Sequence, residues 1–321
     1  MDEIIVLVTS AGVSSAINII KSLKLQNEFK ISIIATDLDE LAPGLHLADH
    51  SYISPPISKT EEYLNFIYEI CEKHNVSVLY PCYSKELAII SRAKDDFNRL
   101  GVKVLLSSPD VIDLCNDKMS ASMKVEELGI PVPKIILNPN KFNLPLFSKP
   151  LEGSSSEGAT YVDNYLKLHY LLNSTEKRIY QEYVSGDEYT IDVLCSNDSD
   201  VLFSGPRKRI STKSGQSVKG ITINNDRLDD YVNSICKSFG VVGVCNIQFI
   251  EREEEFYFIE INPRYAAGGL MLTVKAGANL PLAALKLMLG FNIDKSELVH
   301  KPNIAMTRYW EEIIVEDLHE D

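Results

Sequence analysis

The 321-residue sequence predicts a doubly wound α/β domain at its amino end, followed by a larger α+β region. Two observations support this fold class. Over roughly the first 112 residues, apolar strand-like runs alternate with amphipathic helical patterns, which is typical of a parallel sheet with right-handed crossovers. Beyond about residue 178, strand-like runs follow one another with little helix between them, which favours antiparallel pairing.

The amino-terminal elements alternate strictly. Residues 4–9 (IIVLVT) form an apolar, β-branched run that we interpret as a buried strand, and residues 14–25 carry apolar side chains at helical spacing. The same alternation then continues, with strands expected at 31–36, 76–80 and 102–106 and helices at 60–74 and 86–100.

From about residue 113 the pattern changes. A helix is expected at 117–128, because Gly129, Pro131 and Pro133 end it. Strands are expected at 179–184, 188–195, 201–205, 244–251 and 256–262. A late apolar helix at 279–290 is expected to pack on the core of these strands.

Composition and charge exclude several classes of protein. The net charge of −13 argues against a nucleic-acid partner, which needs clustered Lys and Arg. The sequence has neither an apolar run of about 18 residues nor a basic signal-like start, so no membrane association is expected. The six cysteines lack CxxC spacing and the six histidines lack metal-ligand spacing. We therefore expect a cytoplasmic protein with buried thiols and no zinc.

The strongest functional pattern is VCNIQFIEREEEFYFIEINPR at 244–264, two apolar strands around a charged turn. Glu260 and Asn262 are two residues apart and share one face of their strand. A three-residue loop at 253–255 would place Gln248 opposite Glu260, whereas a loop of even length would not. Three oxygen ligands would then face one side, as Mg²⁺ prefers. The alternative is a solvated sheet face, which the cation Arg264 beyond the ligands disfavours.

Two further segments contain candidate phosphate ligands. Lys149 ends a short apolar segment and precedes the Gly/Ser-rich stretch 153–158, whose backbone amides could wrap phosphate oxygens. Lys118 follows Asp117 at the start of a helix. Considered singly, the stretch is better explained as a surface linker and Lys118 as a solvated side chain.

A nucleoside-reading edge is indicated at IYQEYVSGDEYTID, residues 179–192. The strand end near Tyr183 and Val184 offers backbone groups that could read an adenine edge, and the Glu188 carboxylate could accept ribose hydroxyls. Arg209 belongs to a basic stretch, 207–209, before a Gly/Ser-containing loop. A solvated strand for Glu188 and a hairpin tip for the basic stretch are the structural alternatives.

These features occur in one order, and in that order the chain resembles the ATP-grasp superfamily over nearly its whole length. Within it, the chain is similar to half of the carbamoyl-phosphate synthase large chain. IATDLDELAPGLHLADHSYISPP (34–56) looks like the domain that precedes the ATP-grasp fold, and GGLMLTVKAGAN (268–279) continues the match. The resemblance implies a preceding domain at 1–112, a small lobe at 113–184 and a large antiparallel lobe at 185–321.

The resemblance also implies roles for individual residues. The implied ATP-binding residues are Lys118, Lys149, Gly153, Ser154, Ser155, Ser156, Glu182, Tyr183, Val184 and Glu188. The implied ligands of Mg²⁺, with Mn²⁺ as an alternative, are Gln248, Glu260 and Asn262. The residues implied to offset charge during phosphoryl transfer are Arg264, Lys149 and Arg209. The stretch 153–158 would act as a lid that excludes water.

The activity that the resemblance implies is an ATP-dependent carboxylate–amine ligase, which forms an acyl phosphate and releases ADP and phosphate. Gln248 stands where many relatives have an acid, which predicts lower metal affinity. The sequence shows one ATP-grasp module and no recognisable amidotransferase domain, so the resemblance does not extend to carbamoyl phosphate synthesis itself. The substrates would be a small carboxylate and an amine, with an amino acid as one of them by analogy, and a homodimer is the oligomer to test first.

Two other functions fit parts of the sequence. VTSAGVSSA follows the first strand and Asp37 closes the second, as in NAD-dependent oxidoreductases, but GxGxxG spacing is absent. That alternative also leaves 244–264 unexplained. A nucleotide-binding protein without ligase activity would require the loss of a key group, yet every matched position is filled.

Overall fold

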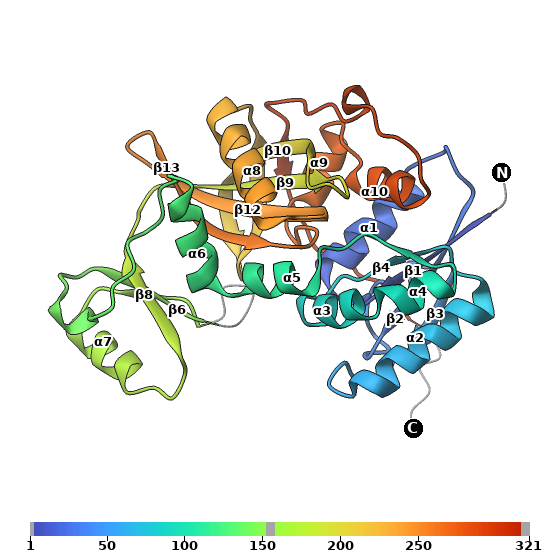
Figure 1. The fold of residues 1–321 in the computed structure, drawn as a ribbon, viewed down its shortest axis with the longest axis horizontal. Helices are drawn as coiled ribbons and strands as arrows, with labels where there is room; N and C mark the ends of the chain where they lie inside the picture. Colours follow the sequence, from blue (N-terminus) through green and yellow to red (C-terminus); the bar gives the residue numbers. More distant parts are fainter. Residues whose placement is uncertain (1–2, 152–157, 316–321) are drawn as a thin grey trace.

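The computed structural model describes residues 3–151 and 158–315. Its sheets follow one another along the long axis of the molecule (Figure 1). A five-stranded parallel sheet lies in the amino-terminal domain, a six-stranded antiparallel sheet lies in the middle, and a three-stranded antiparallel sheet lies at the far end. The predicted combination of α/β and α+β parts is confirmed.

The parallel sheet has the strand order β3-β2-β1-β4-β5. Its strands are β1 (Ile4–Thr9), β2 (Ile31–Asp37), β3 (His50–Ile53), β4 (Val78–Tyr80) and β5 (Lys103–Val104). The chain first moves outward from β1 through β2 to β3 and then returns to β4 on the other side of β1. This reversal makes the carboxyl ends of β1 and β4 a topological switch point, where ligands of doubly wound sheets bind.

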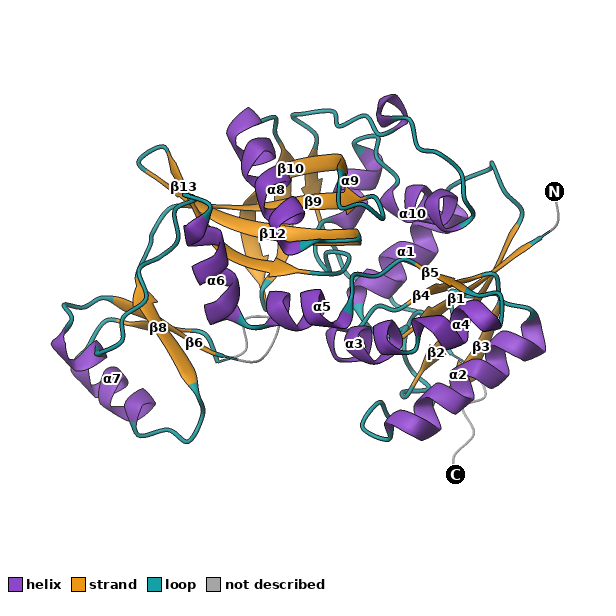
Figure 2. Ribbon diagram, in the orientation of Figure 1, coloured by secondary structure: helices purple, strands orange, loops and turns teal. Residues whose placement is uncertain are grey.

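Helices cover both faces of this sheet (Figure 2). They are α1 (Ser14–Lys24), α2 (Thr60–His74), α3 (Ser84–Arg92) and α4 (Lys94–Arg99). The single helix predicted over 86–100 is therefore two helices, which meet at Ala93, where ψ is 8° and the helix is interrupted. The edge strand β3 escaped prediction because its sequence, HSYI, is largely exposed and lacks an apolar run.

Two helices connect this domain to the small lobe: α5 (Pro109–Asn116) and α6 (Lys118–Glu127). The short 3-10 helix η1 (Pro139–Lys141) follows them. The small lobe consists of β6 (Leu146–Pro150), β7 (Thr160–Val162), α7 (Tyr165–Leu172) and β8 (Arg178–Glu182), with strand order β7-β6-β8. Residue 112 lies within α5 and residue 184 lies between β8 and β9, and the predicted domain boundaries there stay predictions.

The large sheet has the strand order β13-β12-β9-β10-β11-β14. Its strands are β9 (Asp187–Cys195), β10 (Val201–Lys213), β11 (Gln216–Thr222), β12 (Gly243–Arg252), β13 (Glu255–Asn262) and β14 (Ala305–Thr307). Helix α8 (Asp226–Phe239) packs on one face, and its Leu228, Val232 and Phe239 enter the core. The basic stretch 207–209 lies in the long hairpin of β10 and β11 rather than at a hairpin tip.

The β12–β13 hairpin has the predicted pairing of Gln248 with Glu260, but its loop length differs from the prediction. Its loop has two residues, Glu253 and Glu254, because Arg252 pairs with Glu255. Their φ values of 54° and 65° match a type I′ turn. A β-bulge at Ile259 then shifts the register by one residue, so Gln248 lies opposite Glu260 as predicted.

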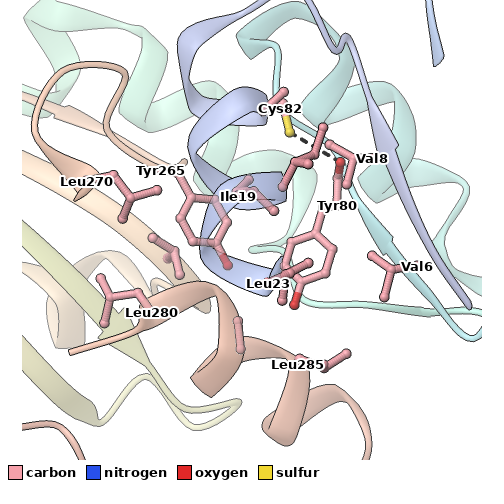
Figure 3. Close-up of a cluster of buried hydrophobic side chains, with 14 of the residues drawn as sticks. Val6, Val8, Ile19, Leu23, Tyr80, Cys82, Tyr265, Leu270, Leu280 and Leu285 are labelled. Atoms are coloured by element: carbon pink, nitrogen blue, oxygen red, sulfur yellow. Dashed lines mark hydrogen bonds between the residues drawn. The ribbon is translucent and has the colours of Figure 1, made fainter. Parts of the chain in front are cut away.

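The carboxyl-terminal helices pack against the amino-terminal domain. These are α9 (Leu270–Lys275) and α10 (Leu280–Met288), followed by η2 (Lys295–Glu297). Figure 3 shows Leu280 and Leu285 in one cluster with Ile19, Leu23 and Tyr80. The predicted contact of this helix with the strand-rich core is present, since α10 contacts β12, and α10 also packs against α1 of the amino-terminal domain, which was not predicted. Among the described helices, none combines the length and apolar character that a membrane crossing requires.

Candidate functional site

A cavity of about 440 Å³ lies between the small lobe and the large sheet. One wall comes from β6 and β8, and the other comes from β9, β10, β12 and β13. Most of the predicted nucleotide and metal residues line it. They are Lys118, Lys149, Glu182, Tyr183, Val184, Glu188, Arg209, Gln248 and Glu260.

A second, smaller cavity of about 50 Å³ shares Arg209, Gln248 and Glu260 with the first. Asn262 and Arg264 line it on the side toward the amino-terminal domain. The two cavities therefore adjoin, and together they form a path from the strand-edge pocket to Arg264, which contacts Ser84 near the switch point of the parallel sheet. Such a path could hold a nucleotide with its phosphates pointing toward Arg264.

The predicted metal ligands come together around one carboxylate. Glu260 Oε1 accepts a hydrogen bond from Gln248 Nε2 at 3.0 Å and another from Asn262 Nδ2 at 3.0 Å. The pairing of β12 with β13 causes this arrangement, because it brings Gln248 opposite Glu260. Across the described residues, no group of three or more His, Cys, Asp or Glu side chains could hold a metal ion.

The oxygen atoms of this cluster fit a hard cation only in part. Glu260 supplies a carboxylate and Asn262 supplies an amide oxygen, which are ligands that Mg²⁺ accepts alongside phosphate oxygens and water. The amide oxygen of Gln248 instead accepts a hydrogen bond from Arg209 Nη1 at 2.9 Å. The Asn262 oxygen has only a longer contact, 3.5 Å from Arg264 Nη2. Glu260 and Asn262 are therefore the better candidate ligands, whereas Gln248 would have to turn its amide to become one.

Lys149 lies inside the cleft rather than at its mouth. Only 6% of the residue is exposed, and Nζ donates a hydrogen bond to the Ile259 carbonyl at 3.1 Å. The bulge in β13 sits at that carbonyl, so a local irregularity of the sheet provides the acceptor. Burial lowers the pKa of the Lys149 ammonium to about 8, although the charge of Glu260 opposes the shift and that of Lys118 adds to it.

Arg264 is a cation that forms no ion pair with a described carboxylate, whereas Arg207 and Arg209 each do. Its partners are neutral: Nε donates to Ser84 Oγ at 2.8 Å and Nη1 donates to the Tyr265 carbonyl at 3.1 Å. Burial lowers the pKa of the guanidinium, and the charge of Glu260 offsets part of this effect. A cation desolvated in this way is suited to an anionic ligand.

Arg209 contacts Glu188, a predicted nucleotide ligand, and Gln248, a predicted metal ligand. Its Nη1 lies 3.0 Å from Glu188 Oε2, and its Nη2 donates to the Gly215 carbonyl at 2.7 Å. The Glu188 carboxylate therefore faces the cavity with a cation beside it. Burial lowers the pKa of Arg209, and Glu188 counters that shift.

The predicted hinge lies where β8 leaves the small lobe. The Glu182 amide donates to the Lys134 carbonyl at 2.9 Å, and its carboxylate accepts from the Lys134 amide at 3.3 Å. Val184 is buried, and the Tyr183 ring lies 4.5 Å from that of Tyr161 in an edge-to-face contact. Tyr161, Tyr183 and Val184 give this part of the cavity wall an apolar surface.

Of the remaining residues predicted to bind the nucleotide, only Lys118 belongs to the described part of the chain. Lys118 lines the cavity, and its Nζ lies 3.5 Å from the Leu151 carbonyl. Gly153, Ser154, Ser155 and Ser156 lie outside the described residues, as does most of the predicted lid 153–158.

Several site residues escaped the sequence analysis. Arg207 and Asp192 form a buried ion pair at 3.1 Å behind the smaller cavity, and Thr273 donates to Asp192 at 2.5 Å. Asn246 is buried beside Asn262, at 3.3 Å. The period-two pattern that singled out Gln248 also places Asn246 on the same face, so this residue could have been found.

The oxidoreductase alternative can be compared with the loop after β1. Asp37 Oδ2 accepts from the Gly12 amide at 2.7 Å, and Oδ1 accepts from the Asp39 amide at 2.9 Å. Both oxygens that would read a ribose in that alternative are thus engaged with the backbone.

Comparison with known proteins agrees with this geometry. Residues 115–268 match the model of the ATP-grasp domain, and residues 6–105 match that of the PylC-like N-terminal domain. The carbamoyl phosphate synthase large chain of Clostridium acetobutylicum is 23% identical over 289 residues, which cover 83% of this chain and 26% of that protein. The chain therefore spans about a quarter of the length of this curated relative.

Solved structures share the fold at low sequence identity. The biotin carboxylase of Campylobacter jejuni, in complex with an ATP analogue, superposes with a TM-score of 0.73 at 18% identity, covering 94% of this chain and 74% of that one. The L-amino acid ligase of Bacillus licheniformis gives a TM-score of 0.69 at 15% identity, covering 92% and 76%. With both domain models matched, the chain carries an ATP-grasp domain behind a PylC-like N-terminal domain.

Proposed function

We propose that this protein is an ATP-dependent carboxylate–amine ligase that works through an acyl phosphate. The observation that carries the proposal is Arg264, which forms no ion pair with a described carboxylate at the end of a path lined by Lys149 and Glu260. That path places a cation where the terminal phosphate of a bound nucleotide would lie. Positioning and charge stabilisation are what phosphoryl transfer requires of a protein.

The nucleotide would lie in the larger cavity, with its base beside Tyr183 and Val184. Glu188 would accept hydrogen bonds from the ribose hydroxyls. Lys118 and Lys149 would contact the phosphates. Arg209, which lies beside Gln248, would contribute a further positive charge near them. Among the structural relatives, one is a 2-oxoglutarate carboxylase domain complexed with ADP and its magnesium salt, which supports a magnesium nucleotide as the ligand.

Glu260 and Asn262 would hold Mg²⁺, which neutralises phosphate charge when it is bound. Both side chains lie on one face of β13. The Asn262 amide nitrogen donates a hydrogen bond to Asn246 Oδ1. The amide oxygen of Asn262 is thereby directed away from Asn246. Mn²⁺ would fit the same oxygen set.

The reaction has two steps. A substrate carboxylate oxygen attacks the γ-phosphorus and ADP leaves, which forms an acyl phosphate. An amine then attacks the acyl carbon, phosphate leaves, and the amine nitrogen loses a proton. Arg264 and Lys149 would stabilise the negative charge that develops on the phosphate oxygens during both steps, since both are cations in a partly water-excluded site.

The substrates are expected to be small molecules, with an amino acid as one of them. Two structural relatives act in related chemistry by name, the L-amino acid ligase of Bacillus licheniformis and an N5-carboxyaminoimidazole synthetase of Staphylococcus aureus. A homodimer is the expected oligomer, and the cytoplasm is the expected compartment.

Release of ADP tests the proposal. A panel of carboxylic acids is incubated with ATP, Mg²⁺ and hydroxylamine, and ADP and hydroxamate are measured together. We expect both products in equal amounts for the correct acid. Formation of AMP and pyrophosphate would overturn the acyl-phosphate mechanism, and nucleotide binding without acid-dependent ADP release would favour a binding protein.

A further inference from the structure

The Arg264 side chain is held from outside the ATP-grasp domain. Its Nε donates to Ser84 Oγ at 2.8 Å, and Ser84 belongs to the amino-terminal domain, 180 residues away in sequence. The other two contacts of the guanidinium come from its own strand end, at the Tyr265 carbonyl and, at 3.5 Å, Asn262 Oδ1. Ser84 is thus the shortest of the three contacts and the one that comes from another domain.

Ser84 itself has a fixed position. It is the first residue of α3, directly after the loop that follows β4. The Glu86 carboxylate is fully buried and accepts hydrogen bonds from the Cys82 and Tyr83 amides at 2.6 and 2.8 Å. The Tyr63 hydroxyl, at 2.5 Å, also donates to it. Because these donors converge on one carboxylate, the backbone before Ser84 cannot shift without breaking buried hydrogen bonds.

Glu86 also fixes the loop that follows β1, which is the other loop at the switch point. The Thr9 and Ser10 hydroxyls, at the end of β1, donate to its two oxygens at 3.0 and 3.1 Å. That loop leads to Ser14, whose hydroxyl donates to Gln216 Oε1 at 3.2 Å, on the wall of the smaller cavity. One buried carboxylate therefore orders both loops that reach the ATP-grasp domain.

The interface around this contact is apolar and continuous. Cys82 and Tyr265, which lie close in sequence to Ser84 and Arg264, belong to the same buried cluster (Figure 3). The Tyr80 hydroxyl donates to the Pro281 carbonyl at 2.8 Å across it. A buried interface of this kind holds the two domains in one relative position, so the distance from Ser84 to Arg264 is set by packing.

We propose that Ser84 is a positioning residue for Arg264 and that the amino-terminal domain thereby sets the geometry of the phosphoryl-transfer end of the site. The proposal rests on the proposed function, in which Arg264 contacts the terminal phosphate. With Nε bonded to Ser84 and Nη1 to the Tyr265 carbonyl, the plane of the guanidinium is fixed. Its Nη2 then faces Asn262, which lines the smaller cavity. Without that bond the side chain can rotate, and part of the population no longer meets the phosphate.

The test compares two nucleotides that differ at the terminal phosphate. Mg²⁺-dependent binding of AMP-PNP and of ADP is measured by calorimetry, and the ratio of the two affinities reports on the terminal phosphate alone. We expect Ser84→Ala to lower the AMP-PNP to ADP ratio about tenfold or more, as expected for one lost hydrogen bond to a charged group. The affinity for ADP should stay unchanged, and Ser84→Thr, which keeps the hydroxyl, should restore the ratio.

Ser91→Ala is the matched control. Ser91 lies on the same helix and donates a buried hydrogen bond to the Ser107 carbonyl at 2.7 Å, away from Arg264. It should lose stability without a change in the ratio. Ser84→Cys keeps the side-chain size but accepts weakly, so it should reproduce the loss and serves if Ser84→Ala fails to fold.

Three results of this experiment would refute the positioning role of Ser84. An unchanged ratio in Ser84→Ala and Ser84→Cys, with a wild type that binds AMP-PNP more tightly than ADP, would refute the positioning role and leave the proposed function intact. An equal loss in Ser91→Ala would show a general effect of stability and would also refute it. A wild type that binds neither nucleotide would overturn both.

Discussion

Lys149 gives the nucleotide site a dependence on pH that can be calculated from its burial. The free ammonium has a pKa of about 8, lowered from 10.5 because it is desolvated. A group with a lowered pKa is charged only below that value, so the free protein keeps its Lys149 cation at pH 7.5 and has lost most of it at pH 9.5. If Lys149 binds ATP phosphates as an ammonium, nucleotide affinity must fall across this interval.

The magnitude follows from the charged fraction. With a pKa of about 8, roughly three quarters of the side chains are charged at pH 7.5 and about 3% at pH 9.5. The apparent affinity for a ligand that binds only the ammonium form therefore falls about 25-fold. For an ordinary lysine with a pKa of about 10.4, the charged fraction falls only from nearly 100% to about 90% over the same interval, so the affinity would change by only about 1.1-fold.

The assay is calorimetric titration of AMP-PNP with Mg²⁺ at both pH values, on the wild type and on Lys149→Met. Methionine has a similar length and no titrating group, so this variant should bind more weakly at pH 7.5 and change little between the two values. The arginines of the site remain charged throughout. A wild-type affinity that stays constant up to pH 9.5, or a Lys149→Met variant with the same decline as the wild type, would refute the role of Lys149.

Three further predictions concern other parts of the molecule. Glu260→Gln should lower acid-dependent ADP release about a hundredfold or more while the melting temperature changes little, because it removes the charge of the metal cluster; near-normal turnover would contradict the metal site. Asp192→Ala should destabilise the protein by about 3–5 kcal/mol in urea titrations, because it leaves the buried Arg207 cation unpaired; a loss under 1 kcal/mol would contradict this. Glu254→Gly should stabilise it by about 1 kcal/mol in the same titration, because Glu254 has a φ of 65°, and a loss of stability would show that the turn is unstrained.

Much of the fold could be predicted from local pattern. The strand at 4–9 and the helix at 60–74 have the predicted bounds, because each has a strong apolar period and clear ends. The common face of Glu260 and Asn262, the candidate metal ligands, also followed from alternation along the β13 sequence, since residues two apart share a face whatever the loop does. The resemblance to ATP-grasp proteins, inferred from the order of short motifs, is confirmed by the match of residues 115–268 to the ATP-grasp domain.

The pairing of Gln248 with Glu260 shows the limit of that reasoning. Loop length alone would have given the wrong register for a two-residue turn, and the bulge at Ile259 restored it. A bulge depends on the contacts of both strands with their surroundings, among them the bond from Lys149 to the Ile259 carbonyl, 110 residues away in sequence. Local sequence does not encode that contact.

The sequence by itself determined the class of fold, the family and the residue types available for chemistry. Only the tertiary structure decided which of them have partners: that Gln248 turns its oxygen to Arg209, that Arg207 is neutralised by Asp192, and that Arg264 is held by Ser84. The physical reason is that these partners lie on other strands of the large sheet or, for Ser84, across the domain interface. The position of Ser84 relative to Arg264 depends on the packing of α1 against α9 and α10, which no segment of the chain specifies alone.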